Sequence, residues 1–518
     1  MQLPRAARYS ILAAIAAIYL LLRLWGLTAG CLWFDEIFGV HAAEHDWGEM
    51  FSFIALDLIH PPLFYIALKA WMAIAGDGLL WLRLFSIAWS AAAIAPFLAL
   101  CRELSLSFTV RAAAFFLLAV NGSLIKYAQE VRMYSMLMCL SLVSMWLFAR
   151  LWSRKKGFGI LLFINLLLIH THYFGWFVVL AEALMLVLLR REWWRRALWL
   201  IAAEAAAFAP WLAAVIAASR SGSDVGQNIG WISRPGPADV FYYVLNLIEP
   251  IYHQASSIEP RSFLPISVPL LAAFCIVATA YFSADRAKNG NDGRLGQIYF
   301  PAMFILVPVI ACFAVSWVSP FSVWGTRHLI ATIPPATILS AILIDGAASR
   351  VLRLCVYGLI GIGAVLAIAI NIMRPPQENV WCVWEPVGNK IGAIEATTEP
   401  PPRIFALEDL AAYHLWFAGR HNSRERVALL SGLPVTTNDK AYFLPRGMND
   451  VERVALDSIN DNSFWLVFRT VDRDEERRLI DEVTATGYVV CLKERRQIGT
   501  ETIISVKFSK EADPCLVR

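Results

Sequence analysis

The chain has 518 residues, of which 58% are hydrophobic and only 17% are charged. Soluble domains are about half apolar and about a quarter charged, so this composition excludes an ordinary soluble protein and predicts a polytopic membrane protein. The formal net charge of +4 does not indicate a nucleic-acid partner, because the basic residues cluster at the ends of apolar runs, where membrane topology places them.

Apolar runs near the ~20 residues that a bilayer requires predict about eleven spanning helices. We expect these helices at residues 9–28, 79–100, 111–128, 134–151, 158–175, 176–190, 197–218, 264–283, 298–318, 328–346 and 352–372. The first run is as long as a span and no A-x-A-like site follows it. We therefore interpret it as a membrane helix and not as a cleavable signal.

Basic clusters between the runs predict the orientation of the helices. They are "PRAAR" before the first run, "SRKK" after the fourth, "RREWWRR" after the sixth, "DRAK" after the eighth and "SRVLR" before the last. All five lie on one side of the membrane if the N-terminus is cytoplasmic. We therefore expect a bacterial inner-membrane protein whose first outer loop, residues 29–78, and whose C-terminal part are extracytoplasmic.

One apolar segment in that loop is too short for a comfortable span. "HPPLFYIALKAWMAIAGDG" (60–78) offers only ~16 residues before its Gly-Asp-Gly break. If it crossed the membrane, every later loop would change sides and the basic clusters would lie outside. We expect it to lie along the outer interface.

The composition changes at about residue 373. Residues 1–372 form the predicted membrane module, and residues 373–518 alternate strand-like runs ("RIFAL", "AYFLP", "SFWLVFR", "YVVCLKERR" and "TIISVKF") with helical stretches such as "DEERRLIDEVTAT". This alternation predicts a small extracytoplasmic α/β domain. In an oxidising compartment, Cys382, Cys491 and Cys515 could supply one disulfide within that domain.

Polar side chains collect in the segments expected on the outer face. They are Asp35 and Glu36, His60, Glu130, Arg132 and Tyr134, His172, and Arg327 and His328. Charges at membrane depth are costly and tend to mark function. Each also has a structural interpretation, such as a solvated helix end, a turn, an ion pair or a headgroup anchor. Glu182 and Glu204 lie inside predicted spans, where we expect them to pair within the bundle.

Together these residues suit the chemistry of a membrane-borne phosphosugar. A guanidinium at headgroup depth, from Arg132 or Arg327, would stabilise a leaving phosphate. Asp35 is a suitable base for the proton of an acceptor hydroxyl. With the base on one face of the sugar and the phosphate on the other, displacement inverts the anomeric centre. Phosphate leaves without strong acid assistance, so the carboxylate pair of glycoside hydrolases is not required.

Several motifs in this order resemble a known family. They are "WFDE" after the first helix, "HPPLFYIALKAW" in the first loop, "LRLFSIAWS" in the next helix, "AQEVRMYSM", "HTHYFG" and "TRHLIATIPP". The chain resembles the GT-C glycosyltransferases of the protein-mannosyltransferase type (glycosyltransferase family 39), with lipid A aminoarabinose transferases as more distant relatives. The resemblance covers roughly residues 10–345.

The resemblance implies inverting transfer of a sugar from a polyprenyl-phosphate donor on the extracytoplasmic side. It also implies that Asp35 is the essential acidic residue of the first outer loop and that Glu36 is its companion. His60 lies where the aminoarabinose relatives carry a lysine for the donor phosphate. Arg327 matches a basic residue before a late helix that Tyr often follows in the family, whereas here His328 follows.

Two other classes fit the composition. A transporter or flippase for a lipid-linked sugar would place its charges near the midplane and often contains inverted repeats; no repeat is evident here. A receptor or assembly protein would leave Asp35, Arg132 and Arg327 without a role. His and carboxylate side chains on one face could hold a divalent ion, although no ligand spacing identifies a metal site. The acceptor, whether protein, glycan or lipid, is not specified by the sequence.

Overall fold

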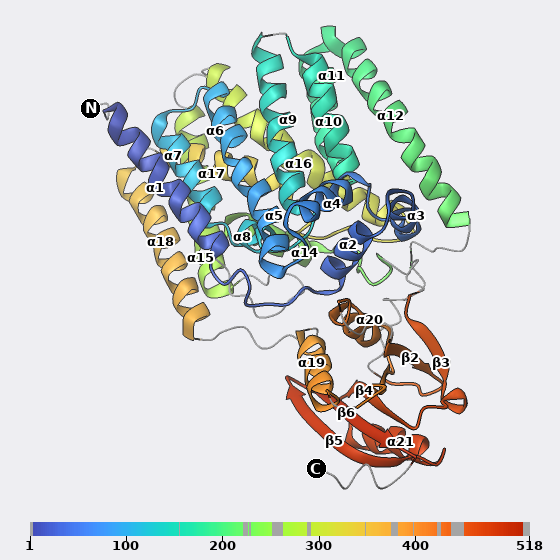
Figure 1. The fold of residues 1–518 in the computed structure, drawn as a ribbon. Helices are drawn as coiled ribbons and strands as arrows, with labels where there is room; N and C mark the ends of the chain where they lie inside the picture. Colours follow the sequence, from blue (N-terminus) through green and yellow to red (C-terminus); the bar gives the residue numbers. More distant parts are fainter. Residues whose placement is uncertain are drawn as a thin grey trace. The chain divides into compact units, whose positions relative to one another are not determined.

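The computed structural model describes residues 4–154, 156–220, 226, 229–250, 263–286, 292–347, 349–373, 382–396, 398–421, 426–436 and 450–510. These belong to two compact units (Figure 1). The first unit comprises Met1–Ala29, Ala42–Gly222 and Ile232–Pro376, and the second comprises Gly30–His41, Ser223–Trp231 and Gln377–Arg518.

Helices build the first unit. They are α1 (Arg5–Leu24), α3 (Trp47–Asp57), α4 (Leu63–Ala75), α5 (Leu79–Ala92), α6 (Ile94–Glu103), α7 (Phe108–Val120), α8 (Gly122–Ala128), α9 (Tyr134–Arg154), α10 (Phe158–Thr171), α11 (Gly175–Leu189), η1 (Arg191–Trp193), α12 (Trp194–Arg220), α14 (Pro237–Ile248), α15 (Leu264–Arg286), α16 (Asp292–Val318), η2 (Ile330–Thr332), α17 (Ile333–Gly346) and α18 (Arg350–Met373). Helix α2 (Phe34–Glu44) begins in the second unit and ends in the first.

Seven helical segments in the described part are long and apolar enough to cross a bilayer. They are Arg5–Leu24, Leu79–Glu103, Tyr134–Arg154, Trp194–Arg220, Leu264–Ser283, Gly296–Val318 and Arg350–Ile370. The other four predicted spans correspond to shorter apolar helices, Phe108–Val120, Phe158–Thr171, Gly175–Leu189 and Ile330–Gly346. The predicted multi-pass helical membrane fold is confirmed, whereas the helix lengths do not establish the number eleven.

The predicted span at 111–128 is interrupted. The continuous helix expected over 111–128 is divided into α7 and α8 at Asn121. The Asn121 side chain accepts a hydrogen bond from the backbone N–H of Leu124 at 3.0 Å and donates to the carbonyls of Asn246 and Leu247 at 3.2 and 3.3 Å. The break is therefore stabilised by a capping amide and by partners more than a hundred residues away, which local hydropathy does not encode.

The predicted first outer loop contains helices of its own. Besides the beginning of α2 it includes α3 and α4. Helix α4 has 13 residues, which at ~1.5 Å per residue is about 20 Å and shorter than the ~30 Å hydrocarbon core of a bilayer. Since α7 also has 13 residues, length alone does not separate α4 from the shorter predicted spans, and the location of residues 60–78 at the interface stays a prediction.

A buried polar network joins α9, α10, α11 and α12. The amide nitrogen of Asn165 donates to Glu182 at 2.8 Å and to Glu204 at 2.9 Å, and the Ser144 hydroxyl lies 2.6 Å from both Glu182 and Asn165. Glu182 is 2% exposed and Glu204 is fully buried. The two carboxyl groups are thus linked within the bundle through Asn165, and hydrogen bonds connect four apolar helices.

Replacement of Asn165 by Leu should destabilise this bundle. The substitution removes both donors from two buried carboxyl groups, and an unsatisfied buried group costs about 1–3 kcal/mol. The melting temperature of the detergent-purified protein should fall clearly. Glu182→Gln, which keeps the size and hydrogen-bonding capacity of the side chain, should lower it less. Equal melting temperatures for Asn165→Leu and wild type would show that the network contributes no stability.

The second unit contains a six-stranded mixed sheet with the order β3-β2-β1-β4-β6-β5. Its strands are β1 (Arg403–Ala406), β2 (Val427–Ser431), β3 (Glu452–Ala455), β4 (Ser463–Thr470), β5 (Val489–Ile498) and β6 (Glu501–Ser509), and its helices are α19 (Trp384–Ile394), α20 (Asp409–Ala418), η5 (Leu456–Ser458) and α21 (Arg473–Thr484). Strands β1 to β4 pair in parallel, and β6 pairs antiparallel with β4 and β5.

Both faces of the central strand are covered. Phe464, Leu466 and Phe468 of β4 pack with Leu479 and Val483 of α21. On the alternate positions, the Trp465 indole donates to Glu395 at the end of α19 at 3.0 Å. This accounts for the continuous apolar run of β4. The predicted α/β domain is confirmed, although β2 and β3 were not expected and "AYFLP" (441–445) lies outside the described residues.

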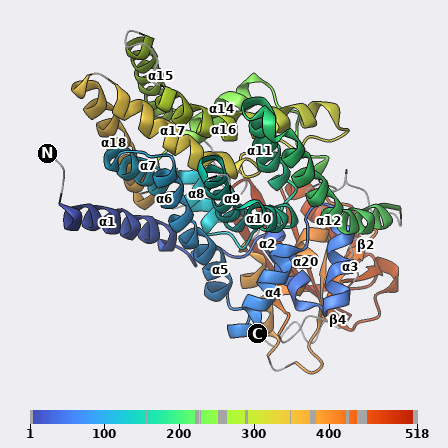
Figure 2. The same cartoon turned by 90° about the horizontal axis from the view of Figure 1, so that it is seen from above.

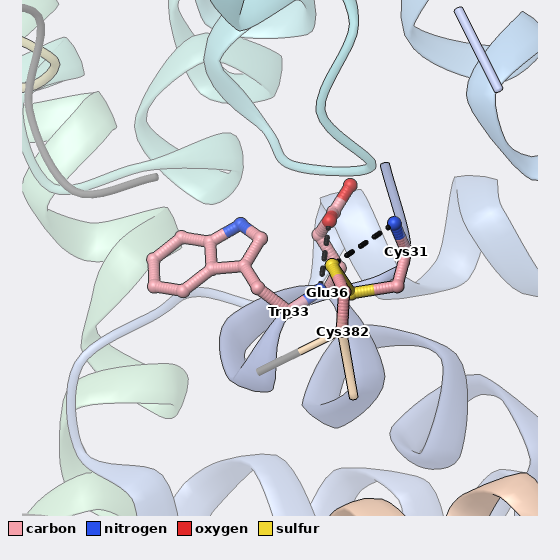
Figure 3. The surroundings of a disulfide bond; sticks show 4 residues. All are labelled: Cys31, Trp33, Glu36 and Cys382. Carbon is pink, nitrogen blue, oxygen red and sulfur yellow. Dashed lines mark hydrogen bonds between the residues drawn. A yellow bond between two sulfur atoms is a disulfide. The ribbon is translucent and has the colours of Figure 1, made fainter. Parts of the chain in front are cut away.

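A disulfide fixes the beginning of α2 to the C-terminal domain (Figure 3). Cys31 is bonded to Cys382 across 351 residues, and the Cys31 backbone N–H lies 3.2 Å from the Cys382 sulfur. Of the three cysteines that could supply a disulfide within the C-terminal part, Cys382 is thus bonded outside it, to the first predicted outer loop. Cys491 is disulfide-bonded as well, and Cys515 lies outside the described residues. His41 adds contacts to the Tyr413 hydroxyl at 3.0 Å and to Asp450 at 3.2 Å.

Candidate functional site

A chain of three polar residues lies between the ends of helices in the first unit. Asp57 ends α3, His60 precedes α4, and Arg132 precedes α9. His60 Nδ1 lies 3.0 Å from the Asp57 carboxylate, and His60 Nε2 lies 3.2 Å from an Arg132 guanidinium nitrogen. Arginine has only donors, so His60 Nε2 accepts and Nδ1–H donates to Asp57. Asp57 thereby fixes the tautomer of His60, and His60 fixes Arg132.

The segment before Arg132 is held by helix α5. Arg83 donates to the carbonyl of Gln129, and the Ser86 hydroxyl donates to the carbonyl of Glu130. The Gln129 side chain donates in turn to the carbonyls of Arg23 and Trp25, at 3.0 and 2.7 Å. The turn between α8 and α9 is therefore rigidly supported, which fixes the backbone that carries Arg132.

His172 lies immediately after α10 and presents a hydrogen-bond donor to the same region. The Phe174 backbone N–H donates to His172 Nδ1 at 3.2 Å, so the proton of the neutral ring lies on Nε2. That Nε2 is buried and has no hydrogen-bond partner among the described residues. The His172 ring lies 5.6 Å from His60, 6.2 Å from Tyr134 and 5.9 Å from His328 between centroids.

The pKa of His172 shows which charges surround it. Burial lowers the pKa of His172 well below its ordinary value, and His60, His328, Arg132 and Arg327 lower it further. Both guanidinium groups therefore act on this imidazole. His172 remains neutral at physiological pH and keeps its Nε2–H as a donor.

Arg327 and His328 come from the segment before η2. Arg327 is 8% exposed and Arg132 is 2% exposed. The His328 ring stacks on Phe174 at 4.7 Å, and its Nδ1 lies 3.0 Å from the Val323 carbonyl. Burial, with Arg327 as the next cause, lowers the pKa of His328 to about 3. A neutral, stacked His328 packs beside the site and holds the segment that carries Arg327.

Two further predicted residues lie in the same unit. Glu130 forms an ion pair with Lys126 at 3.7 Å, so its charge is compensated within α8 and the following turn. The Tyr134 ring packs against Tyr127 at 5.1 Å and also contacts His172. The structure therefore brings His60, Arg132, Tyr134, His172 and Arg327 together around one region.

This arrangement suits an anion better than a metal cation. Arg132, Arg327 and the His172 Nε2–H are donors, and guanidinium groups match phosphate oxygens well. Both nitrogens of His60 are engaged by Asp57 and Arg132, so His60 has no lone pair to offer a metal. Two buried guanidinium groups would also repel a cation.

Asp35 and Glu36 belong to the second unit, in the first turn of α2. Glu36 is fully buried, and its carboxylate accepts the backbone N–H of Trp33 at 3.1 Å (Figure 3). This is a capping contact at the beginning of the helix, and it fixes the local backbone. Asp35 is only half-buried. The two carboxylates are thus in different environments, with Glu36 in a supporting position.

Solved structures of other proteins are similar in fold to this chain. ArnT from Cupriavidus metallidurans, a lipid A aminoarabinose transferase, superposes with a TM-score of 0.58 when bound to undecaprenyl phosphate and 0.57 in the apo state. The match to the bound form covers 96% of this chain and 97% of that chain at 14% identity; the match to the apo form covers 96% and 98% at 15% identity.

The chain has the GT-C fold. The fold expected from the sequence motifs is therefore confirmed. The archaeal oligosaccharyltransferase AglB from Archaeoglobus fulgidus, in complex with an inhibitory peptide and a dolichol-phosphate, superposes with a TM-score of 0.47 at 12% identity over 81% of this chain and 64% of that chain. No family model and no curated protein matches the chain.

Asp57 was not among the residues singled out from the sequence. The sequence spacing could have revealed it, because Asp57 precedes His60 by three residues and a carboxylate is a common partner of a functional imidazole. Lys126, which compensates Glu130, was missed because it lies inside an apolar run and was assigned to a span.

The histidines predict how the stability of the protein depends on pH. His172 and His328 have pKa values in the folded state below those of the unfolded chain, so the unfolded chain binds protons first as the pH falls. The contribution of His328 is complete above about pH 6.5 and is lost as the pH falls toward 3, by up to about 1.4 kcal/mol per pH unit. The contribution of His172 changes in the same direction. The melting temperature should therefore fall between pH 7.5 and pH 5.5.

The double variant His172→Gln/His328→Gln should show a smaller decrease over this pH range. His170→Gln, which replaces a histidine that packs on Phe208, serves as the control and should retain the wild-type slope. An unchanged slope in the double variant would contradict the assignment of buried neutral imidazoles.

Proposed function

We propose that this protein is an inverting glycosyltransferase that moves a sugar from a polyprenyl-phosphate donor to an acceptor hydroxyl on the extracytoplasmic side of the membrane. The observation that carries this proposal is the convergence of Arg132, Arg327 and the neutral donor His172 in the first unit. Three donors around one buried region fit the oxygens of a single phosphate.

The fold supports a lipid-phosphate ligand. The similar ArnT structure contains undecaprenyl phosphate, and the fold shared with it covers nearly all of both chains. A polyprenyl phosphate keeps its chain among apolar helices and its phosphate at the ends of those helices. The three proposed phosphate-binding residues also lie beyond helix ends: His172 follows α10, Arg132 precedes α9 and Arg327 precedes η2.

The disulfides support an extracytoplasmic location for the second unit. Cys31–Cys382 and the bonded Cys491 are in this unit, and disulfides persist in oxidising compartments. The five free cysteines of the described residues, by contrast, all lie in helices of the first unit: Cys101, Cys139, Cys275, Cys312 and Cys355. This distribution agrees with the orientation expected from the basic loops.

In the proposed step, Asp35 takes the proton of the acceptor hydroxyl while the acceptor oxygen attacks the anomeric carbon. The bond between that carbon and the phosphate oxygen breaks, and the electron pair leaves with the lipid phosphate. Arg132, Arg327 and His172 stabilise the charge on the departing phosphate. Glu36 supports Asp35 by fixing the first turn of α2.

Loss of either arginine should impair use of the donor. Arg132→Ala and Arg327→Ala should each lower kcat/KM for the donor ~10–100-fold, because a hydrogen bond to a charged group contributes about 1.5–3 kcal/mol. Arg132→Lys should recover part of the loss, since it keeps the charge but not the planar fork. Arg195→Ala, at an exposed position on α12, is the control and should behave as wild type.

The measurement is the release of free lipid phosphate from a polyprenyl-phosphate sugar by the detergent-purified protein, with thermal melting checked for each variant. If both alanine variants fold and use the donor as well as wild type does, the arginines are anchors and the assigned donor site is wrong. A protein that moves the donor across a vesicle membrane without releasing lipid phosphate would be a flippase.

Asp35→Asn tests the proposed base. The substitution keeps the size of the side chain but removes the basic oxygen, so turnover should fall by roughly 10²–10⁴-fold, the range of general base catalysis. Binding of the donor should change little. Glu36→Gln is the matched control, because the amide oxygen of Gln can still accept the Trp33 N–H, and it should cost less. Normal turnover in Asp35→Asn would exclude the mechanism, and loss of donor binding would assign Asp35 to substrate holding.

A further inference from the structure

Four arginines line one cavity at the end of the bundle where α1 begins. The cavity has a volume of about 290 Å³ and is lined by Arg5, Arg8, Tyr9, Leu12, Leu98, Arg102, Phe108 and Arg111. These residues come from α1, from α6 and from the beginning of α7. Helix α7 packs against both α1 and α6, and Figure 2 shows the three helices next to one another. Among the described residues, no aspartate or glutamate lines the cavity.

The beginnings of two helices add partial positive charge beside three of these arginines. Arg5 and Arg8 lie in the first two turns of α1, and Arg111 lies at the beginning of α7. The N-terminal end of a helix carries partial positive charge, so cations there are unfavourable and carboxylates are favoured. The first turns of α1 and α7 contain no acidic residue. An anion in the cavity would compensate the positive charge at the beginnings of α1 and α7.

Contacts around the cavity leave donor capacity unused. The buried Nε–H of Arg111 has no hydrogen-bond partner among the described residues. The guanidinium of Arg8 lies over the Phe108 ring at 5.6 Å, and this contact orients it. Glu103, an acidic neighbour in the sequence, is engaged by Ser153 and by Arg154, and is therefore not directed at the cavity.

Basic residues are enriched at the cytoplasmic ends of membrane helices, and this general preference is enough to explain why arginines occur at this end. It does not explain why four of them converge from three helices on one cavity that also has apolar walls. Leu12, Leu98 and Phe108 offer a surface for hydrocarbon next to the guanidinium groups. Basic cavities of this kind between membrane helices bind anionic lipid headgroups.

We propose that this cavity binds a phosphate-bearing anion. Because the cavity also has apolar walls, the anion that fits it best is the headgroup of an anionic phospholipid. The site is separate from the proposed donor site, because its residues come from other segments of the first unit. By the orientation expected from the basic loops it faces the cytoplasm. Its occupant would hold α1, α6 and α7 together by pairing with arginines from all three helices.

The test uses the full-length protein, delipidated in a neutral detergent. Binding of short-chain phosphatidylglycerol is measured by native mass spectrometry and compared with phosphatidylcholine of the same chain length. Inorganic phosphate and pyrophosphate are then added as competitors. Wild type should bind phosphatidylglycerol at least ~10-fold more tightly than phosphatidylcholine, the effect of one charge-assisted contact or more.

Arg102→Gln/Arg111→Gln should lose this preference, whereas Arg195→Gln/Arg350→Gln removes the same charge from exposed positions outside the cavity and should keep it. Competition by inorganic phosphate at similar concentrations would support the anion site and identify its occupant as a free phosphate. If the first pair of variants does not fold, Arg5→Gln/Arg8→Gln provides the same test, since removing cations from a helix N-terminus does not weaken the helix.

Two results would overturn the proposal. One is equal binding of phosphatidylglycerol and phosphatidylcholine by wild type. The other is retention of the preference for phosphatidylglycerol in folded variants that lack two of the cavity arginines.

Discussion

The arrangement at the donor site depends on how a buried guanidinium is held. A charge removed from water is costly unless fixed partners compensate for the lost hydration. Arg132 is 2% exposed and contacts His60, whose tautomer is set by Asp57. Helix α5 holds the backbone just before Arg132 through the carbonyls of Gln129 and Glu130. The cation is thus fixed from two directions, which leaves its position independent of any ligand.

The fixed position of Arg132 explains the state of the groups beside it. His172 stays neutral because burial and both arginines disfavour its protonated form, and a neutral ring with its proton on Nε2 can only donate toward an anion. His328 stacks on Phe174 and holds the segment of Arg327 in place. Preorganised donors of this kind stabilise charge that develops in a reaction, because they need no rearrangement when it appears.

Hydropathy predicted the membrane helices because a run of about 20 consecutive apolar residues is the length that a bilayer requires. The features that it missed depend on distant partners. The break at Asn121 relies on carbonyls of Asn246 and Leu247, and Cys31 bonds a cysteine 351 residues away. Strands β4 and β6 were predicted because their apolar runs are long, whereas β3, with four residues and only one of them buried, carries little pattern of its own. Of the donor-site residues, Asp57 was the one that local spacing could have revealed.

In the proposed mechanism, Arg132, Arg327 and His172 bind the phosphate of a polyprenyl lipid. The most direct measurement is isothermal titration of the purified protein with a short-chain polyprenyl phosphate and with the corresponding polyprenol, which lacks the phosphate. The phosphate-bearing lipid should bind at least ~10-fold more tightly, and the triple variant Arg132→Gln/Arg327→Gln/His172→Gln should abolish the difference while still binding the polyprenol. Equal affinity of the wild-type protein for the two lipids would contradict this claim.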